Sequence, residues 1–259
     1  MDKQLVTYKD LGVIDYKTAW EYQESLLREN VQRKSAVARK PVMNAEEAGG
    51  NSETKDIHEL NDGTGPLSTT HYFLLCEHPP VYTLGKSGHA ENILISETEM
   101  QQRGIQFYKT NRGGDITFHG PGQMVVYPII DLEKFYTDIG RYLRDLEEVV
   151  MLTLAEYGIA GKRSRGETGV WIDPDIPGKE RKICAIGVRC SRWVTMHGFA
   201  LNVNTDLGYF DNIIPCGIQN KKVTSIAKEV NIEVEMEEVK EKIQRNFEKV
   251  FNVNLDTKY

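Results

Sequence analysis

Several features that would point to common classes of protein are missing from this sequence. The 259 residues contain no GxxxxGK[ST] motif, which argues against a P-loop nucleotide site. The four cysteines include no CxxC pair and no recurrent short spacing. No apolar run approaches the length that crosses a bilayer. We therefore expect the four cysteines to be free thiols in a chain without a membrane partner.

The overall charge and the first residues narrow the class further. A formal charge of −6 argues against a protein that binds nucleic acid over its whole surface, because phosphate contacts need a clustered basic face. The opening residues, MDKQLVTYKD, show neither a basic-plus-apolar signal pattern nor a cleavage site. We expect a cytoplasmic protein with no nucleic-acid partner.

Positive charge is concentrated between Gly161 and Trp193, where eight basic residues stand against four acidic ones. A solvated surface is the ordinary interpretation of any one of these side chains. As a group, they could dock an acidic protein partner.

The length suits a single domain spanning residues 1–259. Apolar residues at helical spacing behind Asp15 predict a helix over residues 15–32. Residues 33–67 are polar and rich in Gly and Asn, so we expect a mobile insertion there.

Strands and helices follow, interspersed without strict alternation. HYFLLCEHPPVYTLG predicts two strands on either side of a bend at Pro79-Pro80. MVVYPIIDL, GVWID, KICAIGVR and FALNVN predict further strands, while apolar stripes predict one helix from Ile139 to near Gly158 and another from Val239 to Phe251. The order predicts an α/β fold of the α+β type, with helices flanking a mixed sheet.

The densest cluster of chemically distinctive residues is RGGDITFHGPGQ, from Arg112 to Gln123. Its glycines permit positive φ and close approach of a ligand to the backbone, while Arg112 and His119 offer polar contacts. A structural connection is about as consistent with composition alone, but the combination of charge and glycine favours a binding loop.

Two further positions could carry chemistry. Cys216 lies in PCG, between a rigid and a flexible residue, where a thiol is open to ligand, although such a cysteine is more often inert. Lys182 opens a strand, and a partly buried lysine can exchange a proton with a neighbour. His197 by itself is more typical of a structural histidine.

The spacing of Cys76, His78, Cys184 and Cys190 does not fit a zinc site, so we assign no metal.

Taken in order, EHPPVYTLG, RGGDITFHGPGQMVVYPIIDL, TGVWI, KICAIGVR, MHGFALNVN, and IPCGI followed by VTSI closely resemble the octanoyl-[acyl-carrier-protein]:protein N-octanoyltransferase family of lipoate biosynthesis. The resemblance runs from about residue 71 to residue 228. It implies a fold similar to the catalytic domain of biotin and lipoate protein ligases, with a small sub-domain.

The resemblance also implies roles for particular residues. Cys216 corresponds to the family's acyl-thioester nucleophile, and Lys182 to the lysine that lowers the pKa of that thiol and shuttles its proton. The implied substrate-binding positions are Arg112, Gly113, Gly114, Asp115, Ile116, Thr117, Phe118, His119, Ala185, Ile186, Gly187, Gly198, Phe199 and Ala200. Ile183, Ile186 and Phe199, which are apolar and close to this site, are expected to line an acyl tunnel.

The implied reaction moves an octanoyl group from octanoyl-acyl carrier protein to a lysine of lipoyl domains, including those of 2-oxoacid dehydrogenases and the glycine cleavage H protein. Exchange of one thioester for another needs no nucleotide, so no cofactor is expected. Three alternatives remain: an ATP-dependent lipoate or biotin protein ligase, a non-catalytic protein that binds lipoyl domains or acyl carriers, and a cysteine hydrolase.

Overall fold

The computed structural model describes residues 3–38, 68–214 and 222–258. Its strands are β1 (Gln4–Val13), β2 (His71–Glu77), β3 (Val81–Leu84), β4 (Gln106–Lys109), β5 (Ile116–His119), β6 (Gln123–Ile129), β7 (Lys162–Ser164), β8 (Glu167–Ile172), β9 (Arg181–Ser191), β10 (Val194–Asn202), β11 (Lys222–Val223) and β12 (Val253–Asp256). Its α-helices are α1 (Tyr16–Ala38), α2 (Glu97–Gln102), α3 (Ile139–Ala155), α4 (Ile226–Val230) and α5 (Met236–Phe251).

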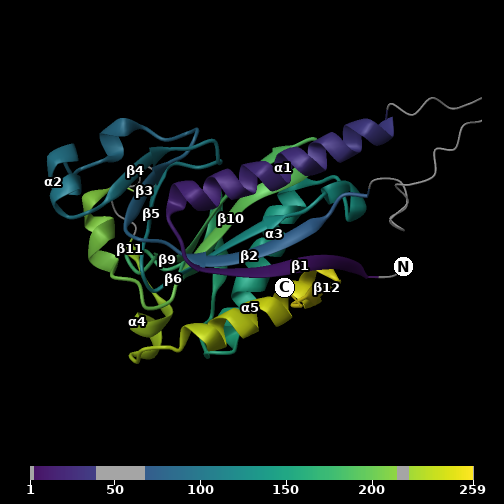
Figure 1. The fold of residues 1–259 in the computed structure, drawn as a ribbon. Coiled ribbons are helices and arrows are strands. Elements are labelled where there is room, and N and C mark those ends of the chain that lie inside the picture. The colour runs from purple at the N-terminus through teal and green to yellow at the C-terminus, as the bar shows by residue number, and fades with distance from the viewer. Residues whose placement is uncertain (1–2, 39–67, 215–221, 259) are drawn as a thin grey trace, which may run out of the picture.

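A large mixed sheet forms the centre of the fold, in the order β12-β1-β2-β6-β10-β9-β8-β7, with β11 beside β9. Strand β1 runs parallel to β12 and β2, whereas the strands from β2 through β7 in this order pair antiparallel. A smaller sheet, β4-β3-β5, lies beside α2 at one end of the molecule (Figure 1). The predicted mixed sheet with flanking helices and a small sub-domain is confirmed.

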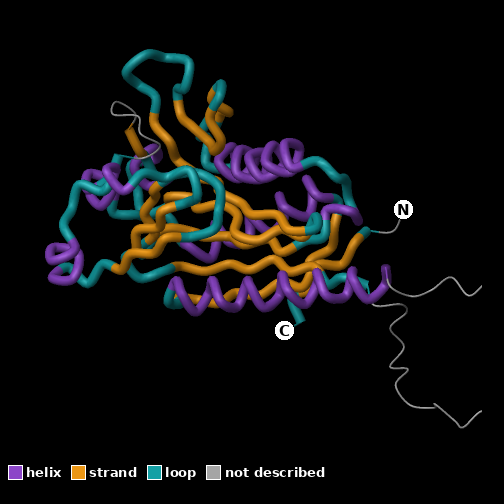
Figure 2. Tube along the Cα trace, turned by 90° about the horizontal axis from the view of Figure 1, so that it is seen from above, coloured by secondary structure: helices purple, strands orange, loops and turns teal. Residues whose placement is uncertain are grey.

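Successive side chains of the central strands face opposite layers, as the period of two in a strand requires. Phe73 and Leu75 of β2 belong to the apolar cluster that includes buried residues of α3 and α5. Leu74 and Cys76 belong to the cluster that includes the buried face of α1. Figure 1 shows α1 and α5 on opposite faces of the sheet, and Figure 2 shows α1 running along the direction of its strands.

Most of the predicted elements are confirmed, including the two strands on either side of Pro79-Pro80 and the two helices in the second half of the chain. The Asp138 carboxylate accepts a hydrogen bond from the Arg141 amide (2.9 Å) and so caps the start of α3. After α3 the chain turns at Gly158, where φ is +73°.

The prediction that the insertion begins at residue 33 is wrong in its first six residues. Helix α1 continues to Ala38, so residues 33–38 are helical. The rest of the predicted insertion, residues 39–67, lies outside the described residues. The helix continues because its second half is anchored to the sheet by polar contacts that composition alone does not reveal.

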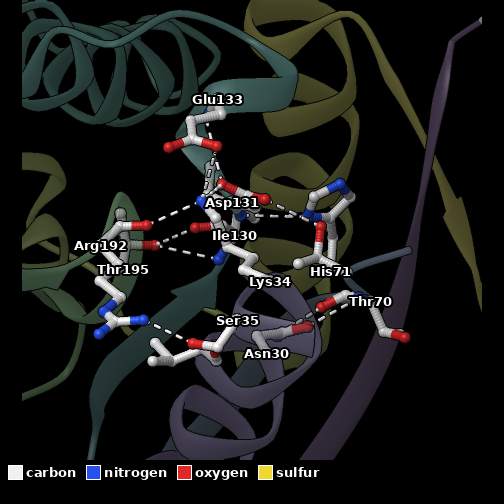
Figure 3. Close-up of polar contacts among 12 residues, drawn as sticks. Asn30, Lys34, Ser35, Thr70, His71, Ile130, Asp131, Glu133, Arg192 and Thr195 are labelled. Carbon is white, nitrogen blue, oxygen red and sulfur yellow. Dashed lines mark hydrogen bonds and ion pairs between the residues drawn. The ribbon is translucent and has the colours of Figure 1, made fainter. Parts of the chain in front are cut away.

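These contacts form a node around Lys34 (Figure 3). The Lys34 ammonium lies 2.6 Å from a carboxylate oxygen of Asp131 and 3.0 Å from one of Glu133. It also donates to the backbone carbonyl of Arg192 (2.8 Å). Asp131 is only 1% exposed, and a buried carboxylate is tolerated when it is paired and hydrogen-bonded. Lys34 therefore joins α1 to the end of β6 and to the β9–β10 turn.

Replacement of Lys34 by Met should lower the free energy of unfolding by about 3 kcal/mol, because it leaves the buried Asp131 carboxylate without its cation. Urea denaturation followed by circular dichroism measures this change. Lys17→Met, on the same helix, is the matched control: that side chain is 61% exposed and should contribute no more than about 0.5 kcal/mol. Equal, small effects of both substitutions would show that the node does not anchor α1.

Candidate active site

A cavity of about 370 Å³ lies between the start of α1, the smaller sheet and strands β6, β10 and β9 of the main sheet. Its wall includes most of the residues predicted to form the site: Arg112, Gly114, Asp115, Ile116, Thr117, His119, Lys182, Ala185, Ile186, Gly187, Gly198, Phe199 and Ala200. The fold thus gathers segments separated by up to about ninety residues around one hollow.

Two predicted substrate-binding residues, Gly113 and Phe118, are not among the residues that line this cavity. Gly113 donates its backbone N–H to the Val188 carbonyl (2.9 Å) and so ties its loop to β9. Phe118 stacks on Tyr209 with 4.4 Å between ring centroids. The sequence suggests a continuous loop here, but Ile116–His119 is a strand, and its alternation sends Phe118 into the core of the smaller sheet.

Glycine allows close backbone packing at two places, one between the loop and the main sheet and one between two strands of the main sheet. A Cβ at Gly187 would lie 2.8 Å from the carbonyl oxygen of Gly113. A Cβ at Gly198 would lie 2.1 Å from the carbonyl oxygen of Val126 on the neighbouring strand. Because real Cβ atoms do not reach such distances, both positions need glycine for close packing of backbone on backbone.

Arg112 enters the cavity wall as a buried cation, 7% exposed. Its guanidinium donates to the backbone carbonyl of Thr83 (2.6 Å), to the Thr83 hydroxyl (2.9 Å) and to the Gly113 carbonyl (3.0 Å). These bonds fix the fork of donors against β3, so Arg112 contributes positive charge at a defined place.

A chain of hydrogen bonds continues from Thr83 through His119. The Asn202 amide donates to the Thr224 carbonyl (3.0 Å), and the Gln123 amide donates to the Asn202 side-chain oxygen (2.8 Å). The Gln123 oxygen is therefore the acceptor that faces His119 Nδ1 (2.8 Å).

The direction of these bonds determines the tautomer of His119. Nδ1 must carry the proton, because it faces the Gln123 oxygen. Nε2 then accepts a long hydrogen bond from the Thr83 hydroxyl (3.4 Å). Burial, followed by the neighbouring His78 and Arg112, holds the pKa of His119 well below its usual value. The imidazole is consequently neutral.

A second neutral histidine supports the floor of the cavity. His78 donates from Nδ1 to the Ile14 carbonyl (2.7 Å), so its Nε2 accepts from the Tyr127 hydroxyl (2.7 Å). Burial lowers the pKa of His78 to about 4 and that of His197 to about 3. The deep part of the cavity is thus polar in composition but holds uncharged imidazoles.

Lys182 lies on the cavity wall at the start of β9. Its backbone is paired with Trp171 of β8 on one side and Val223 of β11 on the other. The ammonium lies 4.6 Å from the centroid of the Trp171 ring, a cation–π distance. Lys182 is half-buried, and Val223 and Phe210 line the same cavity.

Cys216, the predicted nucleophile, lies outside the described residues. Of the other cysteines, Cys76 and Cys184 are at most 1% exposed, and burial raises the pKa of both thiols. Such thiols are poorly reactive. Among residues 3–38, 68–214 and 222–258, no group of three or more His, Cys, Asp or Glu side chains could hold a metal ion. Within the same ranges, no helix is both long and apolar enough to cross a membrane.

Several residues of the cavity were not predicted from sequence. The sequence pattern indicates only core positions for three of them, Tyr16 in a helix and Val125 and Tyr127 in a strand. A fourth, Asn202, is at the end of a strand and belongs to no motif of its own. Gln123 offered the best signal, since it closes the same glycine-rich segment four residues after His119. The remaining lining residues that sequence reasoning missed are Gly166, Glu167, Thr168, His197, Phe210 and Val223.

The basic segment is less positive than its composition suggests. Arg163 pairs with Glu147 and Glu148, and Arg181 pairs with Glu229. These carboxylates lie outside the segment in sequence but meet it in the fold. A segment count of charge therefore overstates the positive surface offered to an acidic partner.

The chain is similar to known proteins of one family over most of its length. The family model of the lipoyl protein ligase A/B catalytic domain matches residues 58–248. An octanoyltransferase of Christiangramia forsetii is 54% identical over 256 residues, covering 98% of this chain and 99% of the relative. One from Flavobacterium psychrophilum is 54% identical over 248 residues, covering 95% and 97%.

Solved structures with the same fold include a lipoate-protein ligase A bound with ATP, at a TM-score of 0.62 and 15% identity, covering 100% of this chain and 90% of that one. Another is a bi-partite lipoate protein ligase from Thermoplasma acidophilum, at a TM-score of 0.62 and 17% identity, covering 99% and 86%. The fold is therefore that of the lipoate protein ligases. The chain belongs to the lipoyl protein ligase A/B catalytic domain family and, within it, to the octanoyltransferases, which are acyltransferases.

The buried histidines make stability depend on pH. Burial lowers the pKa of His71 and His78 to about 4 and that of His197 to about 3, below about 6.5 in the unfolded chain. The unfolded state therefore binds more protons in this window. The free energy of unfolding should fall as pH drops below about 6.5, by up to about 1.4 kcal/mol per pH unit for each histidine.

Urea titrations at about pH 7 and about pH 5.5 measure this slope. His71→Asn keeps an acceptor for the Asp131 amide. It should reduce the slope of the unfolding free energy against pH by the contribution of one histidine. His89→Asn, at a side chain that is 75% exposed, is the control and should keep the wild-type slope. A His71→Asn slope equal to that of the wild type would contradict the neutral, buried state of His71.

Proposed function

We propose that the protein transfers an octanoyl group from octanoyl-acyl carrier protein to a lysine of lipoyl domains, through a thioester on Cys216. Lys182 is the proton carrier, and neither a nucleotide nor another cofactor takes part. The acceptors are the lipoyl domains of 2-oxoacid dehydrogenases and the glycine cleavage H protein, and the enzyme works in the cytoplasm.

The observation that carries this proposal is the meeting of Lys182 and β11 on the cavity wall. Val223 is the register partner of Lys182, and the Thr224 amide donates to the Lys182 carbonyl (2.9 Å). Phe210 and Val223, which lie on either side of Cys216 in the chain, both line the cavity. A nucleophile carried by the intervening segment would have both a base and an acyl pocket within reach.

The cavity supplies an apolar wall for the acyl chain close to Lys182. Ile186 and Phe199, two of the residues expected to form a tunnel, line it. Ile183 is fully buried and is not among the lining residues, so the expected tunnel includes only two of these three side chains. Apolar contact of this kind holds an aliphatic chain, while the few polar groups orient its carbonyl end.

The proposed reaction has two half-reactions. Lys182, in its neutral form, takes the proton of the Cys216 thiol, and the thiolate attacks the carbonyl carbon of the octanoyl thioester. The tetrahedral intermediate collapses, the bond to the phosphopantetheine sulfur breaks, and Lys182 returns the proton to that sulfur. In the second half-reaction the target amine attacks the carbonyl carbon of the acyl-enzyme, and the bond from that carbon to the Cys216 sulfur breaks as the amide forms. The proton lost by the amine passes through Lys182 to the Cys216 sulfur, which regenerates the thiol.

The nearest alternative, an ATP-dependent lipoate or biotin ligase, shares the fold but has no need of Cys216. The relatives that match nearly the whole chain at 54% identity are named octanoyltransferases, which favours acyl transfer. The two ligases of the same fold described above are at most 17% identical to this chain, so they support only the assignment of the fold.

Intact-protein mass spectrometry after mixing with octanoyl-acyl carrier protein, without ATP, tests the proposal. The wild type should gain the mass of one octanoyl group and lose it when apo lipoyl domain is added. Cys216→Ala should gain nothing. The matched control is Cys190→Ala, which should still form the adduct. Burial raises the pKa of the Cys190 thiol and makes it a poor nucleophile, so its loss should not matter. An adduct that survives Cys216→Ala, or one that requires ATP, contradicts the proposal.

Lys182→Met should slow formation of the acyl-enzyme by about 10²–10⁴-fold at neutral pH, the usual contribution of a positioned base. The loss should shrink as pH rises, because the thiol then ionises without help. Stopped-flow acylation rates across the pH range give this profile. Lys179→Met, which removes an exposed lysine of the same segment, should follow the wild type. A loss in Lys182→Met that is the same at every pH would exclude a proton-transfer role.

A further inference from the structure

A second hollow lies against the outer side of the cavity. It has a volume of about 570 Å³ and is lined by Lys17, Trp20, Glu21, Glu24 and Arg28 of α1 together with Tyr108 of β4. Helix α1 and strand β4 thus enclose this hollow, which we call the outer groove. None of them is among the described residues that line the inner cavity.

The ring of Tyr16 separates the two hollows. Tyr16 lines the cavity, is 2% exposed, and stacks on His119 with 5.7 Å between centroids and 11° between ring planes. The centroid of the same ring lies 5.7 Å from that of Tyr108, with 22° between the ring planes, and 6.3 Å from that of Trp20. Both of these neighbours line the outer groove. A single aromatic ring therefore forms this part of the wall.

Tyr16 also lies at the deep end of the cavity. Near Lys182 the wall is open, since Gly166 is exposed and Glu167 and Thr168 are half-buried. At the other end Tyr16 and Tyr127 are at most 3% exposed. An acyl chain attached near Lys182 would therefore point its methyl end toward Tyr16.

The two ends are offset both across and along the main sheet. Lys182 is on β9, whereas Tyr16 contacts His78, the partner of Tyr127 on β6. Strands β9 and β6 are separated only by β10, which amounts to two strand spacings or about 10 Å. Cys184 is level with Met124 through Leu201, so Lys182 and Tyr127 are also offset by about five residues, or about 16 Å, along the strands. An acyl chain that joins the two ends therefore runs obliquely across β10.

We infer that Tyr16 is the wall that ends the acyl site and so limits the length of the acyl chain, an inference that rests on the proposed function. Loss of the ring joins the cavity to the outer groove. The methyl end of a longer chain then passes between His119 and Tyr108 and lies against Trp20. Helix α1, which carries none of the sequence motifs, thereby determines a property of the substrate.

Tyr16→Ala tests this inference through acylation rates with octanoyl-, dodecanoyl- and hexadecanoyl-acyl carrier protein, followed by intact-protein mass spectrometry. The dodecanoyl-to-octanoyl rate ratio should rise at least about tenfold, since added methylenes in an apolar pocket discriminate by such factors. Tyr16→Phe keeps the ring and should keep the wild-type ratio. Trp20→Ala widens the outer groove alone and should also keep it.

An unchanged ratio in a Tyr16→Ala protein that still takes octanoyl groups overturns the inference. Thermal unfolding is measured first, and if Tyr16→Ala does not fold, Tyr16→Leu replaces it, with a smaller rise expected. Failure of the proposed function is a different result, because the wild type itself would then form no octanoyl adduct. In that case, calorimetric titration with octanoate and dodecanoate tests the wall directly: only the Tyr16 variant lacking the ring should gain affinity for dodecanoate.

Discussion

The hydrogen-bond chain through His119 is the constraint on which the site depends. It begins at the Arg112 guanidinium, which can only donate, and ends at the Thr224 carbonyl, which can only accept. Between them, Thr83, His119, Gln123 and Asn202 must all orient their dipoles in one direction. The chain links the smaller sheet to β6 and β10 and then to the residue that follows β11. The hydrogen-bond chain, with a single arrangement of its protons, therefore connects the smaller sheet, strands β6 and β10, and the residue after β11 around the cavity.

This constraint explains how a cavity that we propose to hold an aliphatic chain can have so many polar residues in its wall. His119 and Gln123 satisfy one another, and His78 is satisfied by Ile14 and Tyr127. A polar side chain whose hydrogen bonds are already made can present a ring face to an apolar ligand without losing a partner. The lowered pKa values of the histidines extend this logic, because an imidazolium would need a counter-charge that an alkyl chain cannot provide.

Local pattern predicts most of the fold, since the strands around Pro79-Pro80 and the helices at Ile139 and Val239 follow from apolar spacing. The motif residues Arg112, His119 and Ala200 also meet at the cavity. Pattern fails where a long-range contact decides the outcome. Residues 33–38 are helical because Lys34 reaches Asp131, nearly a hundred residues away. Tyr16 lines the cavity and contacts Tyr108 and His119, whereas helical periodicity marks it only as a core residue.

The most direct test of the central interaction is ¹⁵N NMR of the His119 imidazole, assigned by comparison with His119→Gln. The hydrogen-bond chain predicts a neutral ring with the proton on Nδ1 and an unprotonated Nε2, unchanged from about pH 7 down to about pH 5. An imidazolium, or a neutral ring protonated at Nε2, would contradict the direction of the hydrogen-bond chain and the neutral state of His119 that follows from it.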